Sequence, residues 1–240
     1  LVNDILSRAN RDDAVFRKDQ IQAEKVKTQR ASEAQDYFQT HAKDWDSIRS
    51  LYVKEEKVEH EMQQMLGDAT IELLLDIGTG TGRILELFAN QYKKGIGVDI
   101  NHEMLRHARA RLDRLNLKSC ELRHADITRF DFNNRQASTI IMHQVLHFVT
   151  EPKKVIREAA RLLQKGGKLM IVDFAPHTQD QLRTEFAHQR LGFEEHQLWS
   201  WIKIAGLKPL QFKTLTNHSS VKQNDRSAET LNVSLWLAGK

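Results

Sequence analysis

Short apolar runs alternate with amphipathic segments along the middle of the chain. Runs of the kind that form buried strands occur at residues 71–75, 95–99, 118–123, 138–142 and 168–173. Segments in which apolar positions recur at helical spacing lie between them, at residues 83–90, 103–115 and 152–163. Because strands that alternate with helices form βαβ units, this pattern predicts a parallel sheet with helices on both faces.

The C-terminal third departs from this alternation. A helix is predicted at residues 195–205, where Gly206 ends it, and two strand-like runs follow at residues 210–215 and 231–237. Only a polar segment joins these two runs, which indicates an antiparallel hairpin at the edge of the sheet. The complete pattern therefore predicts an α/β fold, with a doubly wound, mostly parallel sheet of seven strands.

The first part of the chain is predicted to be helical. Residues 16–42 contain neither Pro nor Gly, and their sparse apolar positions need a covering partner: the main domain, a second copy of the chain, or another domain. A second helix is predicted at residues 54–66 and ends at Gly67. We therefore divide the chain into a helical extension at residues 1–67 and a main domain at residues 68–240, and expect a homodimer.

The composition narrows the possible surroundings and partners. The only cysteine, Cys120, permits no disulfide within the chain, which indicates a reducing compartment, most simply the cytoplasm. It also permits no thiolate-rich metal site, and we expect no metal site in the chain. No apolar run is long enough to span a bilayer, so no membrane is expected as a partner. The net charge of +4 is only weak support for a nucleic-acid partner.

The most informative motif is the glycine-rich turn at Gly78, Gly80 and Gly82, between the first predicted strand and the helix after it. A dinucleotide-binding turn has two residues between its last two glycines, whereas this turn has one. Asp76, at the end of the strand, suits an ammonium group better than a pyrophosphate, and Asp99, at the end of the second strand, can accept hydrogen bonds from ribose hydroxyls. A purely structural turn and a nicotinamide site are the alternatives.

These residues resemble the S-adenosylmethionine site of class I methyltransferases, which have a Rossmann-like fold. The resemblance covers about residues 71–237 and implies S-adenosylmethionine as cofactor, with S-adenosylhomocysteine as product. It implies that the cofactor is held by Asp76, Gly78, Thr79, Gly80, Asp99, Ile100, Met104, Asp126, Ile127 and His143. Asp99 would hold the ribose, Ile100 and Met104 the adenine ring, Asp126 the adenine amino group, and His143 would lie near the sulfonium. Tyr37, Phe38 and Trp45 are the nearest candidates for an aromatic lid.

A narrower resemblance covers residues 30–55. This stretch is similar to methyltransferase domains that follow an arsenic-repressor-type (ArsR) winged-helix transcriptional regulator. The resemblance implies that residues 1–13 are the tail of a preceding DNA-binding domain, and that nucleic acid is bound only through that domain.

Four residues after the fourth and fifth predicted strands are candidates for the catalytic base: His143, His147, Asp173 and His177. The carboxyl ends of parallel strands line the ligand crevice, and histidine has a pKa suited to proton transfer. His143 could instead only pack on the cofactor, and His147 could cap a helix.

The acceptor is predicted by elimination. The signatures of DNA amino-methylation, cytosine-C5 methylation and arsenite methylation are missing, so a small organic molecule remains the default methyl acceptor. The alternative is a regulatory domain that senses S-adenosylmethionine or S-adenosylhomocysteine without turnover.

Overall fold

The computed structural model describes residues 14–46, 54–130, 132, 136–216 and 231–240. One seven-stranded sheet runs through the molecule in the order β3-β2-β1-β4-β5-β7-β6. The first five strands of this order are parallel, and β7 is antiparallel to both β5 and β6. This sheet confirms the predicted doubly wound α/β fold.

The seven strands follow the predicted apolar runs. Five of them are longer than predicted, whereas the third is one residue shorter and the last is displaced by two residues. Their bounds are β1 (Ile71–Ile77), β2 (Tyr92–Asp99), β3 (Cys120–His124), β4 (Ala137–His143), β5 (Leu163–Phe174), β6 (Lys208–Leu215) and β7 (Val233–Gly239). The polar residues at the start of β5 hid the beginning of that strand in the sequence, because only its later part is continuously buried. The two last strands pair as predicted, but β7 lies inside the sheet and β6 forms its edge.

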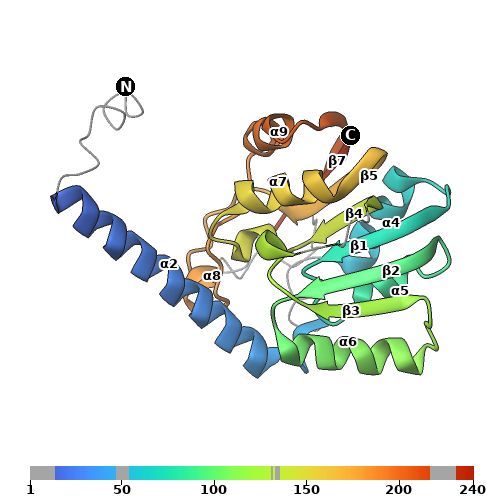
Figure 1. Cartoon of the computed structure of the whole chain (residues 1–240), viewed down its shortest axis with the longest axis horizontal. Helices are drawn as coiled ribbons and strands as arrows, with labels where there is room; N and C mark the ends of the chain where they lie inside the picture. The colour runs from blue at the N-terminus through green and yellow to red at the C-terminus, as the bar shows by residue number, and fades with distance from the viewer. Residues whose placement is uncertain (1–13, 47–53, 131, 133–135, 217–230) are drawn as a thin grey trace, which may run out of the picture.

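Helices cover both faces of the sheet (Figure 1). One apolar cluster joins the sheet to α4 (Glu55–Leu66), α5 (Arg83–Leu87) and α6 (His102–Arg114). A second cluster, on the opposite face, joins it to α7 (Pro152–Leu162) and α9 (Glu195–Ile204). Adjacent residues of β1 illustrate the division, since Leu74 belongs to the first cluster and Leu75 to the second. The predicted helices are confirmed, but α5 is shorter than expected and the short α8 (Gln181–Glu185) was not predicted.

The N-terminal helix α2 (Ala14–His41) reaches away from the body of the molecule (Figure 1). Val15 and Ile21, in its outer part, expose 66% and 58% of their surface, whereas Ala34 is buried against the body. The expected homodimer would cover the outer part and stays a prediction, as does the boundary after residue 67. Residues 1–13, the predicted tail of a preceding domain, lie outside the described residues.

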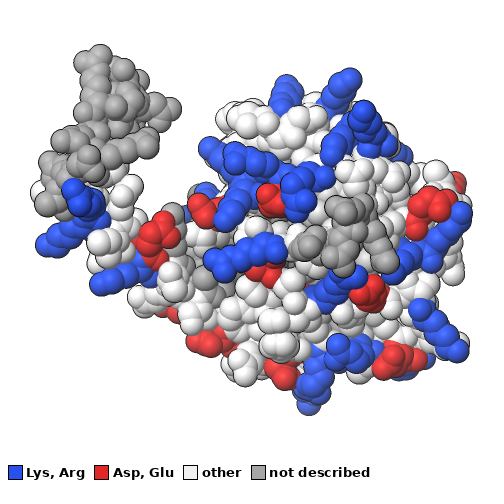
Figure 2. All heavy atoms as spheres, in the orientation of Figure 1, with Lys and Arg blue, Asp and Glu red and all other residues white. Residues whose placement is uncertain are grey.

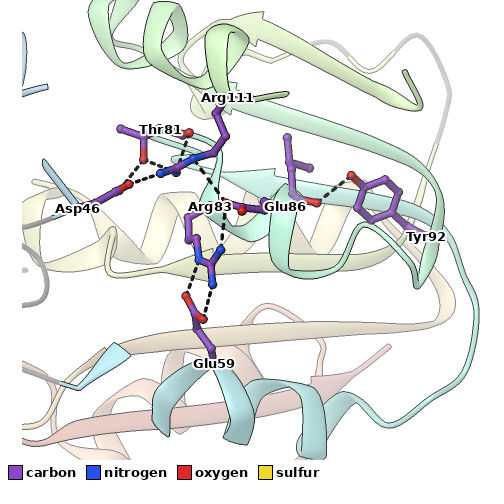
Figure 3. A network of polar contacts seen from close by, with 8 residues as sticks. Asp46, Glu59, Thr81, Arg83, Glu86, Tyr92 and Arg111 are labelled. Atoms are coloured by element: carbon purple, nitrogen blue, oxygen red, sulfur yellow. Dashed lines mark hydrogen bonds and ion pairs between the residues drawn. The ribbon is translucent and has the colours of Figure 1, made fainter. Parts of the chain in front are cut away.

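A network of charged side chains ties the segment before β1 to the main body (Figure 3). Arg83, on α5, donates two hydrogen bonds of 2.7 Å to the carboxylate of Glu59, on α4. Asp46, after α2, accepts hydrogen bonds from Thr81 in the glycine-rich turn and from Arg111 on α6. The extension is thus attached directly to the turn that the sequence analysis singled out.

The described part of the chain contains neither a helix that could cross a membrane nor a cluster of side chains that could hold a metal ion. None of its helices combines the length and the apolar character that crossing a bilayer requires. No group of three or more His, Cys, Asp or Glu side chains within it could hold a metal ion.

Candidate functional site

A cavity of about 420 Å³ lies at the carboxyl ends of β1, β2 and β4, beneath the inner end of α2. This volume is within the range of about 300–1,000 Å³ that is typical of small-molecule and cofactor sites. With the exception of Asp76, every residue that the sequence assigned to the cofactor lines this cavity: Gly78, Thr79, Gly80, Asp99, Ile100, Met104, Asp126, Ile127 and His143. The structure therefore brings together residues that lie far apart in the sequence.

The glycine-rich turn forms one wall of the cavity. Gly78, Gly80 and Gly82 all have positive φ, at 70°, 51° and 81°, a conformation that side-chain-bearing residues rarely adopt. A Cβ atom on Gly78 would lie 2.5 Å from Cγ2 of Val145, whereas one on Gly80 would have nothing closer than 3.9 Å. Glycine is thus required at Gly78 for both conformation and space, and the open side of Gly80 leaves the backbone accessible from the cavity.

Asp99 holds the turn from the neighbouring strand. Its Oδ2 accepts a hydrogen bond of 2.8 Å from the backbone N–H of Gly80, and its Oδ1 accepts one of 2.8 Å from Asn101. Burial raises the pKa of the Asp99 carboxyl above its ordinary value, and the backbone hydrogen bonds from Asn101, Gly80 and Ile100 oppose this rise. Asp99 therefore presents a fixed, poorly hydrated carboxyl group to the cavity.

Apolar side chains and one more carboxylate form the neighbouring wall. Met104 is buried, and Ile100 lines the cavity although it is 48% exposed. Oδ1 of Asp126 accepts hydrogen bonds of 2.8 Å from the backbone N–H and the hydroxyl of Thr128, which fixes the orientation of this carboxylate. The result is an apolar wall with an acceptor group at its edge, a combination that suits a heterocycle bearing an amino group.

Asp76 lies outside the cavity wall. Its side chain is only 1% exposed, and it is not among the residues that line the cavity. The sequence located this residue at the correct end of β1 but gave no information about the side of the sheet to which its side chain points. Its predicted contact with an ammonium group stays a prediction.

His143 is the only one of the four candidate bases that lines the cavity within the described part of the chain. It ends β4, and its Nε2 lies 3.8 Å from Oε2 of Glu55, at the start of α4. Gln144, which follows it with a φ of 54°, donates a hydrogen bond of 3.5 Å to Oε1 of the same carboxylate. The sequence analysis missed Glu55, because a single glutamate at the start of a helix gives no sign of a partner so distant in the chain.

The other three candidate bases do not line the cavity, although the sequence placed them near the crevice, and a catalytic role for them stays a prediction. His147 Nδ1 donates a hydrogen bond of 2.7 Å to Oδ1 of Asp173, and both side chains are almost completely buried. His177 packs edge-on against Phe174 and does not line the cavity. The carboxyl ends of β4 and β5 do meet. The side chains of His147 and Asp173, however, are hydrogen-bonded to each other behind the cavity wall.

The buried histidine cluster should make stability depend on pH. Burial, with smaller contributions from His147 and His177, lowers the pKa of His188 to about 2, whereas an unfolded histidine titrates near 6.5. The unfolded state therefore binds a proton that the folded state rejects, and His188 alone should reduce the free energy of unfolding by about 2 kcal/mol between pH 7 and pH 5. Urea unfolding at both pH values measures this difference.

The matched variants isolate the contribution of His188. His188→Phe should flatten the pH dependence, whereas His196→Phe, at an exposed position on α9, should leave it unchanged. Equal pH dependence in the wild type and in His188→Phe would show that His188 takes up no proton on unfolding.

Aromatic side chains from the extension close the cavity. Phe38 and Trp45 line it together with Phe148, and their ring centroids lie 4.7 Å (Phe38–Phe148) and 5.1 Å (Phe38–Trp45) apart in edge-to-face contacts. Tyr37, the third predicted lid residue, does not line the cavity and stacks on His41 instead. Two of the three lid candidates are thus at the cavity, and Phe148 joins them.

Comparison with known proteins identifies the central part of the chain. Residues 75–171 match the family model described as a methyltransferase domain. A phosphatidylethanolamine N-methyltransferase of Cereibacter sphaeroides is 35% identical over 101 residues, which cover 42% of this chain and 49% of the relative. A demethylmenaquinone methyltransferase of Tropheryma whipplei is 31% identical over 112 residues, which cover 47% of this chain and 46% of the relative. The matched part thus spans about half the length of these curated relatives.

Solved methyltransferase structures share the fold of this chain. The N-methyltransferase NodS of Bradyrhizobium japonicum, solved in complex with S-adenosylhomocysteine, superposes with a TM-score of 0.68 at 16% identity over 86% of this chain and 98% of NodS. At this identity the likeness concerns the fold, and the evidence for methyltransferase chemistry is the family match over residues 75–171. Residues 75–171 therefore match a methyltransferase domain, and the fold around them is the one found in solved methyltransferases.

Proposed function

We propose that this protein transfers the methyl group of S-adenosylmethionine to a small-molecule acceptor in the cavity at the end of β4. The observation that carries this proposal is the pairing of the glycine-rich turn with Asp99, which holds an accessible backbone and a carboxylate side by side. The matched relatives are named for acceptors that are a phospholipid and a quinone precursor, which supports an acceptor of small-molecule or lipid type.

The residues of the cavity match the parts of this cofactor. Asp99 would accept hydrogen bonds from the ribose hydroxyls, as carboxylates at this place in related nucleotide sites do. Ile100, Met104 and Ile127 would enclose the adenine ring, with Asp126 at its amino group. The open side of Gly80 would let the cofactor pass close to the backbone.

When bound, S-adenosylmethionine supplies a methyl group on a positively charged sulfur atom, which is a good leaving group. The protein has to hold the acceptor in line with that group and keep water out. Phe38, Trp45 and Phe148 provide an apolar wall for this purpose. His143, at the end of β4, is the cavity residue that can receive a proton from the acceptor.

The surface next to the cavity adds an electrostatic preference. Basic side chains gather over α7 on the face that Figure 2 shows, where this helix exposes Lys153, Lys154, Arg157 and Arg161. Lys154 also lines the cavity. A positive rim of this kind attracts anionic ligands, so an acceptor that carries a negative group would be favoured over a neutral one.

Calorimetric titration tests the cofactor assignment without knowledge of the acceptor. S-adenosylmethionine and S-adenosylhomocysteine should both bind with micromolar affinity, and NAD should not bind, because the glycine spacing and Asp76 disfavour a pyrophosphate. Formation of S-adenosylhomocysteine with a panel of amine, hydroxyl and phospholipid acceptors then tests the reaction. Binding of NAD alone would refute the proposal.

A second proposal concerns regulation. The sequence resemblance of residues 30–55 to methyltransferase domains behind winged-helix regulators supports a longer protein in which this domain reports cofactor binding to a DNA-binding domain. Cofactor-dependent DNA binding by such a protein, without methyl transfer to any acceptor, would favour the sensing function. Rapid transfer to one compound would count against it.

A further inference from the structure

Helix α4 is held rigidly beside the cavity. Val58 and Met62 are fully buried in the core. The carboxylate of Glu59 accepts hydrogen bonds from Nε and Nη2 of Arg83 (Figure 3). Glu55 precedes Glu59 by four residues, so the two carboxylates share one face of the helix. Fixing Glu59 therefore fixes the helix backbone from which the side chain of Glu55 extends.

Glu55 meets the end of β4. Its carboxylate lies 3.8 Å from Nε2 of His143 and 3.5 Å from Nε2 of Gln144. The side chains of Glu55 and His143 are 13% and 2% exposed, so little water screens the interaction between them. His143 lines the cavity, and Glu55 lies one layer behind it.

We propose that Glu55 is a positioning residue that orients His143 as the proton acceptor of the reaction, for an acceptor whose methylated nitrogen or oxygen carries a proton. This inference rests on the proposed methyltransferase function. It adds to that function a residue that positions the base and the class of the methyl acceptor. The N-terminal extension thereby supplies part of the active site, and the acceptor is an amine or a hydroxyl compound.

The proton balance of the step is simple. The acceptor would gain the methyl group as the bond between that group and the cofactor sulfur breaks, and the sulfur would keep the electron pair in neutral S-adenosylhomocysteine. The acceptor also loses one proton, which passes to the imidazole of His143 and then to water. No oxidant or reductant is involved. The carboxylate of Glu55 stabilises the imidazolium that forms, and a distance of 3.8 Å before the acceptor is bound can shorten in the complex.

The other charged groups near His143 do not replace Glu55. Among the described cavity residues, Arg83 on α5 pairs with Glu59 and Glu86. Asp99 accepts hydrogen bonds from the backbone N–H groups of Gly80 and Asn101, and Asp126 accepts one from that of Thr128. Arg129, Glu151 and Lys154 also line the cavity, and they remain the same in the variants compared below. Asp173, on the strand next to β4, is hydrogen-bonded to His147. Asp76 is buried on the other neighbouring strand, β1, and it remains the same in the variants compared below.

An NMR titration of the His143 imidazole tests the coupling without any acceptor. In the complex with S-adenosylhomocysteine, Glu55→Gln should move the titration midpoint of His143 about one pH unit or more lower, because a carboxylate at this distance favours the protonated ring. Glu56→Gln, at the next and exposed position of the same helix, should leave the midpoint unchanged. An unchanged midpoint in Glu55→Gln would overturn the inference.

The pH–rate profile with an acceptor found in the panel tests the role in the reaction. Glu55→Gln should lower kcat about 10- to 100-fold and move the profile to lower pH, with the affinity for S-adenosylhomocysteine unchanged within about twofold. Glu55→Asp should recover part of kcat. Equal kcat in the wild type and Glu55→Gln, or a fastest acceptor without a proton to lose, would overturn the inference.

The two proposals fail in different ways. Absence of S-adenosylhomocysteine binding by the wild type would refute the proposed function itself. Normal binding together with an unchanged His143 midpoint would refute only the role of Glu55. Thermal unfolding of each variant shows whether it is folded, and Glu55→Asp serves as the second variant should Glu55→Gln unfold.

Discussion

Replacement of Asp99 by alanine should weaken the binding of S-adenosylmethionine and S-adenosylhomocysteine by about 100-fold or more. The variant loses the carboxylate that would bind the ribose, and it leaves the backbone N–H groups of Gly80 and Asn101 without their acceptor. Hydrogen bonds to a charged group contribute about 1.5–3 kcal/mol each, and about 1.4 kcal/mol corresponds to a tenfold change in affinity. Calorimetric titration of the variant measures the loss directly.

The control for this experiment is Asp113→Ala, on the exposed side of α6. It removes a carboxylate of the same type and should leave the affinity unchanged. Asp99→Asn separates charge from geometry, since the amide oxygen can still accept one hydrogen bond. A wild-type affinity in Asp99→Ala would mean that the cofactor is held by other groups of the cavity.

Replacement of Gly78 by alanine should destabilise the folded protein by about 2–5 kcal/mol. The new Cβ would lie 2.5 Å from Cγ2 and 2.9 Å from Cγ1 of Val145, and the backbone there is left-handed with a φ of 70°. The left-handed conformation costs about 1–2 kcal/mol, and overpacking costs about 1–3 kcal/mol. Equilibrium unfolding in urea measures the sum.

Gly80→Ala is the matched control, because its φ is also positive but the nearest atom is 3.9 Å from the added Cβ. It should cost only the backbone term of about 1–2 kcal/mol. Val145→Ala in the Gly78→Ala background should relieve part of the crowding, which a double-mutant cycle detects as a coupling free energy of about 1 kcal/mol or more. Equal losses in Gly78→Ala and Gly80→Ala would show that Val145 moves away at little cost.

The sequence predicted that the glycine-rich turn and Asp99 lie together, and the structure places both at the cavity, for a physical reason. The glycine-rich turn and Asp99 depend on local geometry, namely a strand that ends, a turn with positive φ, and a carboxylate at the end of the next parallel strand. These requirements leave a signature in the spacing of residues. Chain order then brought Asp126 and His143 to the same edge of the sheet.

The acceptor side was predicted less well. Placing a residue at the end of a strand does not determine the side of the sheet to which it points, and this is why His147 and Asp173 were expected in the crevice although they bind each other. Glu55 was missed because its contact with His143 depends on how α4 docks, which is set by Arg83 and by buried apolar residues far away in sequence. Tertiary packing of this kind has no periodic signature.

The position of β7 has a consequence for the order in which the molecule can assemble. This strand lies between β5 and β6, yet it follows every other strand in sequence. Until β7 has been synthesised, β5 ends the parallel part of the sheet with an unpaired edge, and β6 has no neighbour with which to pair. Late in its synthesis, a nascent chain therefore exposes the unpaired edge of β5. Rapid pairing of β7 with that edge protects the edge from pairing with other chains.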